Sequence, residues 1–148
     1  MKHLLAVAAL LAIAYGLNLQ TRPPAPVAIH AASQETDQTA IARGRAVYTR
    51  YGCVACHGDD GKGGFANANA ETDGRVPGVI YVAEGYTRNE LRRKVLDGLA
   101  TVGKKDPRGP RPPFRMPGWA GQMSNDELGD LVEYLFSLYP NTETQKWR

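Results

Sequence analysis

The sequence predicts an all-α domain in which three main helices and two long loops surround a bound group. Three segments carry apolar residues at helical spacing, and no segment alternates for long enough to build a sheet. Two loops rich in glycine and proline, residues 58–85 and 103–122, separate these segments. Loops this long are unusual in a compact domain unless they wrap something, so side chains alone are not expected to fill the interior.

The first helix is expected over residues 39–51. Its apolar residues form an approximate stripe along one face: Ile41, Val47, Tyr48 and Tyr51. Gly44 interrupts this segment. A glycine inside a helix costs up to about 1 kcal/mol relative to alanine, and it usually has a packing reason.

Capping boxes mark the starts of the second and third helices. Thr87 is followed three residues later by Glu90, and Ser124 is followed in the same way by Glu127. In each pair the hydroxyl and the carboxylate can satisfy backbone N–H groups at the start of a helix. Apolar residues then follow at helical spacing: Leu91, Val95, Leu96 and Leu99 in the second helix, and Leu128, Leu131, Val132, Leu135 and Leu138 in the third.

An unbroken apolar run near the N-terminus follows a single lysine, which is typical of a secretory signal or a short membrane anchor. Residues 1–21 are expected to be one or the other, and both alternatives carry the rest of the chain across a membrane. Residues 22–37 are expected to form a proline-rich spacer or tether, in which Arg-Pro-Pro-Ala-Pro at its start is extended and semi-rigid and residues 33–37 are flexible. The domain then covers residues 38–140, and residues 141–148 form a polar tail.

The composition excludes two classes of protein. The formal net charge of +3 falls to about +1 when residues 1–32, with two cations and no acid, are set aside. A nucleic-acid-binding domain is usually far more basic, so no nucleic-acid partner is expected. The chain has only two cysteines, three positions apart, so it is not a disulfide-stapled scaffold.

The chemistry of the chain is concentrated in Cys53-Val54-Ala55-Cys56-His57, a C-x-x-C-H sequence of the kind that attaches a c-type haem. Two thiols three residues apart can add to the two vinyl groups of one porphyrin. The histidine that follows then lies beneath the ring, where its imidazole can bind iron. The sequence therefore predicts one covalent haem c on Cys53 and Cys56, with His57 as an axial ligand.

Other roles for the cysteine pair fit less well. A structural zinc site needs four nitrogen or sulfur ligands, and residues 33–148 hold only two cysteines and one histidine. A thioredoxin-like dithiol needs a βαβ context, which is missing. A disulfide between Cys53 and Cys56 would close too short a loop to stabilise the domain much.

The order of these features resembles that of the class I cytochromes c, which are small monohaem electron carriers. The resemblance covers about residues 38–139: a helix with Gly44, the CVACH motif, long loops, a Met-Pro pair and a C-terminal helix with Tyr134. It implies the cytochrome c fold, with the first and last helices crossing at Gly44 and the Tyr134 ring packed nearby. Gly44 stands one residue further from Cys53 than in many family members, so a looser turn is expected before Cys53.

The resemblance also implies roles for residues around the haem. The carbonyl of a proline in the first loop accepts a hydrogen bond from the proximal histidine, and Pro77 fits this role best; the alternative is an ordinary turn proline. Such a bond would orient the His57 ring and make it a more basic ligand. Phe114 and Trp119 stand on either side of Met116, and these places in the sequence predict that their rings pack on the porphyrin.

The sixth ligand of the iron decides the function. His57 is the only histidine of the expected domain, so the candidates are Met116, Met123 or an open position. Met116 lies in a loop ahead of the last helix and matches the distal ligand of the family. Met123 has another role available, as a hydrophobic staple against Leu128. Ligation by His57 and Met116 would raise the reduction potential, as in cytochromes c.

A basic segment, residues 104–115, carries five cationic side chains against a single acidic one, Asp106. The five are Lys104, Lys105, Arg108, Arg111 and Arg115. One interpretation is a positive rim that steers a redox partner with an acidic docking surface. The other is a solvated loop.

Together these observations predict an electron carrier, not an enzyme, which shuttles single electrons between redox partner proteins of a respiratory chain. We expect it on the periplasmic side of a bacterial cytoplasmic membrane, tethered there, or soluble in the periplasm if the leader is removed. One alternative is a fixed subunit of a membrane oxidoreductase, attached through its anchor and residues 141–148. Another is a five-coordinate haem enzyme or gas sensor, although no distal acid–base pair is visible.

Overall fold

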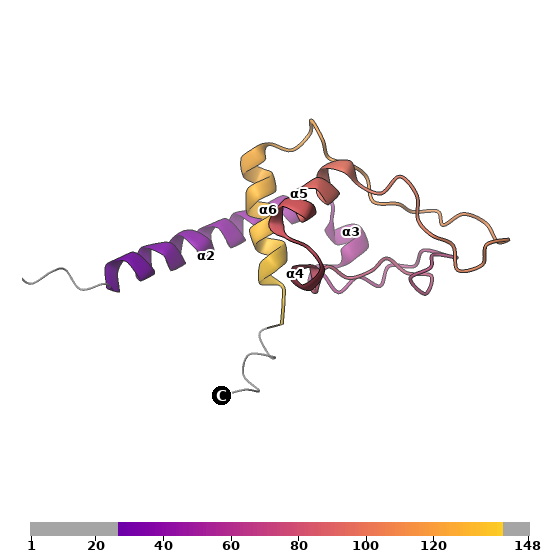
Figure 1. Ribbon diagram of the computed structural model, residues 1–148, viewed down its shortest axis with the longest axis horizontal. Helices are drawn as coiled ribbons and strands as arrows, with labels where there is room; N and C mark the ends of the chain where they lie inside the picture. Colours follow the sequence, from indigo (N-terminus) through magenta and orange to yellow (C-terminus); the bar gives the residue numbers. More distant parts are fainter. Residues whose placement is uncertain (1–26, 141–148) are drawn as a thin grey trace, which may run out of the picture. The chain divides into compact units, whose positions relative to one another are not determined.

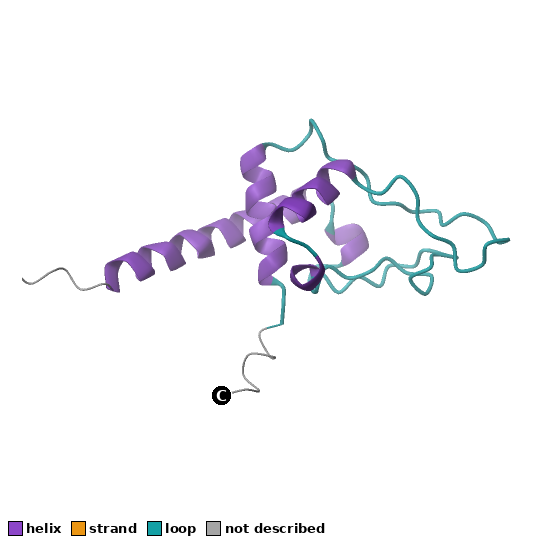
Figure 2. Cartoon of the chain, in the orientation of Figure 1, coloured by secondary structure: helices purple, strands orange, loops and turns teal. Residues whose placement is uncertain are grey.

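The computed structural model describes residues 27–140, which form helices and loops (Figure 1, Figure 2). The helices are α2 (Val27–Arg50), α3 (Val54–His57), α4 (Val82–Gly85), α5 (Arg88–Asp97) and α6 (Asn125–Ser137). Within residues 27–140 no strand occurs, and two isolated bridges pair Ala66 with Arg75 and Ala70 with Lys104. The all-α prediction is therefore confirmed.

The chain divides into two compact units, residues 1–34 and 35–148. The second unit holds the C-terminal part of α2 and every later helix. The expected signal or anchor, residues 1–21, and the expected tail, residues 141–148, lie outside the described residues.

Helix α2 begins well before the expected start at Thr39. It therefore includes residues 33–37, which were expected to be a flexible tether, whereas the extended proline-rich stretch expected at residues 22–26 lies outside the described residues. The proline-rich run ends at Pro26, and no proline or glycine lies between Val27 and Arg43 to stop a helix. Among the helices of residues 27–140, none has both the length and the apolar character needed to cross a membrane.

The end of α2 leads directly into the cysteine motif. Gly52 has a left-handed backbone conformation, with φ of 73°. The Gly52 N–H donates to the Thr49 carbonyl and the Cys53 N–H donates to the Tyr48 carbonyl, both at 3.1 Å. These two bonds form a Schellman motif, which satisfies carbonyls at the end of a helix. The looser turn expected before Cys53 is therefore not found, because a hydrogen-bonded helix end occupies this position.

Both predicted capping boxes are confirmed. The Thr87 hydroxyl accepts from the Glu90 N–H at 3.3 Å, and the Glu90 carboxylate accepts from the Thr87 N–H at 2.8 Å. Ser124 and Glu127 make the same pair of bonds, at 3.2 and 2.8 Å. Leu99, expected on the apolar face of α5, lies beyond the end of that helix and is 39% exposed, because a glycine caps the helix before it.

Helices α2 and α6 cross at Gly44, as the resemblance implied. A Cβ atom added to Gly44 would overlap the carbonyl oxygen of Asp130 and would lie 2.7 Å from Cβ of Tyr134. Next to this point the rings of Tyr48 and Tyr134 pack with 5.3 Å between their centroids. The absence of a side chain at Gly44 therefore allows the two helices to touch through their backbones.

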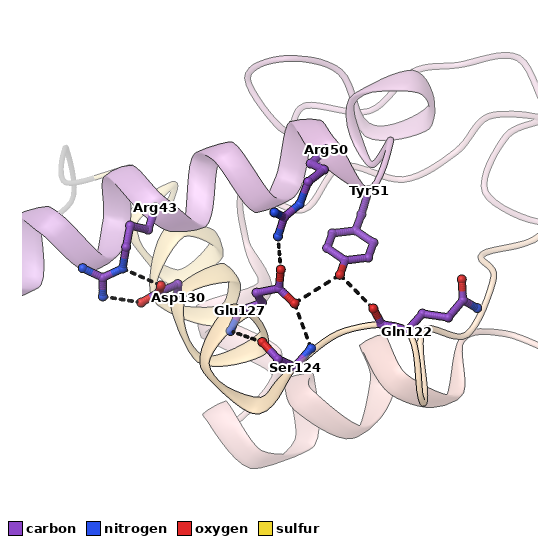
Figure 3. A network of polar contacts seen from close by, with 7 residues as sticks. All are labelled: Arg43, Arg50, Tyr51, Gln122, Ser124, Glu127 and Asp130. Carbon is purple, nitrogen blue, oxygen red and sulfur yellow. Dashed lines mark hydrogen bonds and ion pairs between the residues drawn. The ribbon is translucent and has the colours of Figure 1, made fainter.

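Polar contacts reinforce the crossing on its exposed side (Figure 3). Arg43 on α2 forms an ion pair with Asp130 on α6, with 2.6 Å between Nε and Oδ2. Closer to the end of α2, the Glu127 carboxylate accepts from Arg50 and lies 3.1 Å from the Tyr51 hydroxyl. The carboxylate that caps α6 is thereby also joined to α2.

The core consists of buried side chains from α2, α5 and α6 together with one residue just before α6. They are Val47, Tyr48, Leu91, Val95, Met123, Leu128, Leu131, Val132, Tyr134 and Leu135. The outer parts of the two long loops extend away from these helices (Figure 2). The helices therefore form a core of their own, and the loops are left to build the site.

Candidate haem site

The C-x-x-C-H motif forms a short helix, α3, with Cys53 as its N-cap. The Cys53 carbonyl accepts from the His57 N–H at 2.9 Å. Cys53 and Cys56 are half-buried, and no disulfide joins them. Burial raises the pKa of the Cys53 thiol to about 11, so this group is a neutral thiol near pH 7. One helical turn thus brings together two free thiols and an imidazole.

The carbonyl of Pro77 fixes the His57 ring. Nδ1 of His57 lies 2.9 Å from the Pro77 oxygen, which is the contact that the resemblance implied. A carbonyl oxygen can only accept a hydrogen bond, so Nδ1 is the atom that carries the hydrogen. In a neutral ring Nε2 then keeps its lone pair and is available to a metal ion.

Two glycines of the first long loop allow its backbone to pack closely against His57 and Pro77. The Gly63 N–H donates to the His57 carbonyl at 2.8 Å, and the Gly64 N–H donates to the Val76 carbonyl at 2.9 Å. A Cβ atom on Gly63 would lie 2.7 Å from the Pro77 oxygen, which is too close for any residue other than glycine. Sequence analysis did not single out Gly63, although the density of glycines after His57 was a signal.

Met116 lies on a segment that is held against the end of α5. Its carbonyl accepts from the Leu99 N–H at 2.9 Å, and the Trp119 N–H donates to the Val95 carbonyl at 3.2 Å. The Met116 side chain is half-buried and packs against the core. Met123, the other candidate ligand, is 8% exposed and belongs to the core itself. The two methionines therefore have different surroundings.

The two aromatic residues expected on the porphyrin lie in different environments. Phe114 is 45% exposed and packs edge-on against Phe65, with 5.2 Å between ring centroids. Trp119 is half-buried and packs edge-on against Tyr51, at 5.3 Å. Phe65 is itself 42% exposed. The loops therefore present apolar rings of the kind that a porphyrin would cover.

Asn67 and Asn69 join the two long loops, and sequence analysis identified neither. Nδ2 of Asn67 donates to the Phe114 carbonyl at 2.9 Å, and its Oδ1 accepts from the Phe114 N–H at 3.1 Å. Asn69 donates to the carbonyls of Asp106 and Pro110, at 3.0 and 2.6 Å, and accepts from the Asp106 N–H at 2.8 Å. An amide side chain can both donate and accept, but the sequence does not indicate its partners.

The basic segment, residues 104–115, is tied back at its start. Lys104 donates to a carbonyl of its own loop at 2.9 Å, and Lys105 forms an ion pair with Asp73 at 3.1 Å. Arg108 and Arg111 are exposed, and none of the ion pairs found in residues 27–140 involves them. Within the basic segment, these two arginines are the cations most available to a partner.

The donor set fits a covalent haem better than another metal centre. Nowhere between residues 27 and 140 do three His, Cys, Asp or Glu side chains gather as metal ligands, whereas structural zinc needs four ligands. Two free thiols, one imidazole nitrogen and apolar aromatic rings instead supply two points of attachment, one axial ligand and an apolar cover.

Comparison with known families agrees with this assignment, because the cytochrome c family matches residues 41–139. This chain belongs to the cytochrome c family. No curated protein and no solved structure matches it significantly. The matched region contains the C-x-x-C-H motif, so this cytochrome carries one covalent haem c. Its predicted fold and its class of function, haem-based electron transport, are confirmed.

Proposed function

We propose that this cytochrome is a one-electron carrier whose haem iron takes His57 and Met116 as axial ligands. The observation that carries the proposal is the 2.9 Å contact between His57 Nδ1 and the Pro77 carbonyl, which leaves Nε2 for iron. Bound haem iron supplies reversible one-electron chemistry. The chain's own residues attach the group, orient its ligands and exclude water.

On the proximal side, Pro77 orients His57 and makes it a better donor. A hydrogen bond from Nδ1–H to a carbonyl increases the electron density at Nε2, which favours the oxidised iron. The close approach of Gly63 to the Pro77 oxygen keeps that carbonyl within reach of the ring. The proximal side thus lowers the reduction potential slightly.

On the distal side, Met116 has the opposite effect. A neutral thioether favours the reduced iron, so His/Met ligation raises the reduction potential. Met116 is the better candidate because backbone hydrogen bonds fix its segment in place, while its side chain is only half-buried and so can reach a ligand-binding position. Met123 is enclosed in the core. Phe114 and Trp119 would cover the porphyrin and exclude water.

The experiment that tests this ligation is spectroscopic. The oxidised cytochrome is expected to show a sulfur-to-iron charge-transfer band, and the reduced form is expected to resist carbon monoxide. A reduced protein that binds carbon monoxide readily, with no charge-transfer band in the oxidised form, would support the five-coordinate enzyme or sensor instead. A fixed subunit of an oxidoreductase complex would show the same spectrum but would co-purify with its complex from native membranes.

The proposed location is the periplasmic face of a bacterial cytoplasmic membrane. It is supported by the apolar run in residues 1–21 and by covalent haem attachment, which suits an exported chain. Redox partner proteins are implied by the family, and exposed Arg108 and Arg111 favour partners with acidic docking surfaces. Mass spectrometry of the mature protein tests the tether: a start near Met1 supports an anchor, and a start near Ala32 supports a removed leader.

A further inference from the structure

Apart from tyrosines, Asn67 is the one buried polar residue within residues 37–140, and it is 3% exposed. Its backbone is fixed inside the first long loop, because its N–H donates to the Gly74 carbonyl at 2.7 Å and its carbonyl accepts from the Ala70 N–H at 3.0 Å. A buried amide side chain is costly unless both of its polar ends are paired. In Asn67 both ends are paired with the same residue, Phe114.

Phe114 lies two positions before Met116 in the second loop. The Asn67 amide holds Phe114 from one side, and the bond from the Leu99 N–H to the Met116 carbonyl, at 2.9 Å, holds the segment from the other. The short piece of chain that carries the Met116 sulfur is therefore fixed at two points. One of these points is a single side chain from a distant part of the sequence.

We propose that Asn67 is a positioning residue for Met116, which keeps the sulfur in place by clamping the backbone at Phe114. The inference rests on the proposed ligation by Met116. A protein ligand on a mobile segment spends part of its time away from the metal, and this part is the open fraction. An added ligand that competes for the iron then binds in proportion to the open fraction. Loss of both Asn67 bonds increases the open fraction without removing any group that touches the haem.

Asn69 provides a matched comparison. Its side chain makes the same kind of bonds between the two loops, but to Asp106 and Pro110, which lie further from Met116 along the chain. A residue that merely joins the loops would therefore behave like Asn69. A residue that positions Met116 would not.

The experiment uses the full-length, haem-loaded, oxidised cytochrome titrated with imidazole, and it follows loss of the sulfur-to-iron band. Asn67→Ala removes the Asn67 side-chain amide. Asn69→Gly removes the Asn69 amide, and glycine is used there because residue 69 has a φ of 62°, which glycine adopts freely. Removal of two hydrogen bonds at Asn67 is expected to tighten apparent imidazole binding about tenfold. The change in Asn69→Gly is expected to stay under about threefold.

A second measurement needs no variant, in case Asn67→Ala fails to fold. If the clamp favours the Met116-bound state, displacement of Met116 must weaken the clamp by the same factor. Saturating imidazole is therefore expected to speed amide hydrogen exchange at Phe114 several-fold. Exchange at the Lys105 N–H, which donates to the Asn69 carbonyl at 2.9 Å, is expected to stay constant.

Two results would overturn the role of Asn67 and leave Met116 ligation standing. One is equal imidazole affinity in the two variants, and the other is an equal effect of imidazole on amide exchange at Phe114 and Lys105. Absence of the sulfur-to-iron band from the unmodified protein would overturn the ligation itself, and the inference with it.

Discussion

Gly44 and Asp130 meet backbone to backbone where α2 crosses α6, and the carbonyl oxygen of Asp130 occupies the space that a Cβ of residue 44 would need. The side chain of Asp130 pairs with Arg43 at the same point. One residue of α6 thus contacts α2 through both its backbone and its carboxylate. The separation of the two helices is therefore set at a single position.

Gly44→Ala is expected to lower the free energy of unfolding by about 2–3 kcal/mol, because the added methyl group forces the two helices apart. Chemical denaturation of the haem-loaded protein measures this change. Gly129→Ala is the control, since a Cβ at Gly129 on α6 would lie 3.5 Å from the Arg92 guanidinium, an ordinary contact. It is expected to raise stability by about 0.5–1 kcal/mol. Similar changes in both variants would contradict the close crossing.

Gly63→Ala is expected to raise the reduction potential. Its methyl group would displace the Pro77 carbonyl, weaken the bond to His57 and so favour the reduced iron. A shift of tens of millivolts is expected, since about 59 mV corresponds to a tenfold change in a one-electron equilibrium. Gly64→Ala has the same unfavourable backbone conformation, with φ of 94°, but its Cβ would meet nothing within 4 Å. Redox titration should therefore find an unchanged potential in Gly64→Ala.

Met116→Ala is expected to abolish the sulfur-to-iron band, lower the reduction potential and open the iron to added ligands. Met123→Leu is expected to keep all three properties and to cost under about 1.5 kcal/mol, because it conserves volume in the core. Absorption spectra and redox titrations of both variants check this. Loss of the band in Met123→Leu alone would reverse the assignment of the ligand.

The helices could be predicted because their signals are local. The pairs Thr87–Glu90 and Ser124–Glu127 define helix starts within four residues, and both formed as expected. Helix α2 begins before the expected residue 39 because no proline or glycine lies between Pro26 and Gly44, and this continuity is not visible in the apolar stripe.

Only the part of the site that lies within one local sequence motif could be predicted. The cysteines and His57 are adjacent in sequence, so their chemistry is visible without a structure. The partners of Asn67 and Asn69 lie 37 to 47 positions away, and no local pattern indicates such pairings. Gly63 was missed for the same reason, since its role depends on contact with Pro77 across a loop.

The free energy of unfolding is expected to fall in acid, because the carboxylate that caps α6 becomes protonated. Hydrogen bonds from the backbone and hydroxyl of Ser124 lower the pKa of Glu127 below its ordinary value of 4.5. The stabilisation is therefore present above about pH 4.5 and is lost as pH falls through the lower folded-state pKa. Glu127→Gln should reduce stability at neutral pH and flatten its dependence between about pH 6 and 3. An unchanged slope in denaturation measurements would argue against this contribution.

Arg108→Glu combined with Arg111→Glu is expected to slow electron transfer with an acidic redox protein about tenfold at low salt, because steering by exposed charge is lost. The unmodified cytochrome should slow as salt rises, since exposed charges are screened beyond about 8–10 Å near physiological salt. Arg93→Glu makes the same kind of charge change at an exposed position on α5. If stopped-flow rates fall equally in Arg93→Glu, net charge and not the basic segment is responsible.

Helix α2 runs without a break from Gly44 to the Schellman motif at Gly52, so the number of residues between these two glycines matters. Each residue of an α-helix advances about 100° around its axis. One residue inserted between Gly44 and Gly52 would therefore turn the haem-binding cysteines about a quarter of the way around α2 while the crossing with α6 stayed in place. Insertions and deletions in this stretch should survive only when the turn at Gly52 changes with them, so the helix fixes the direction in which the haem faces.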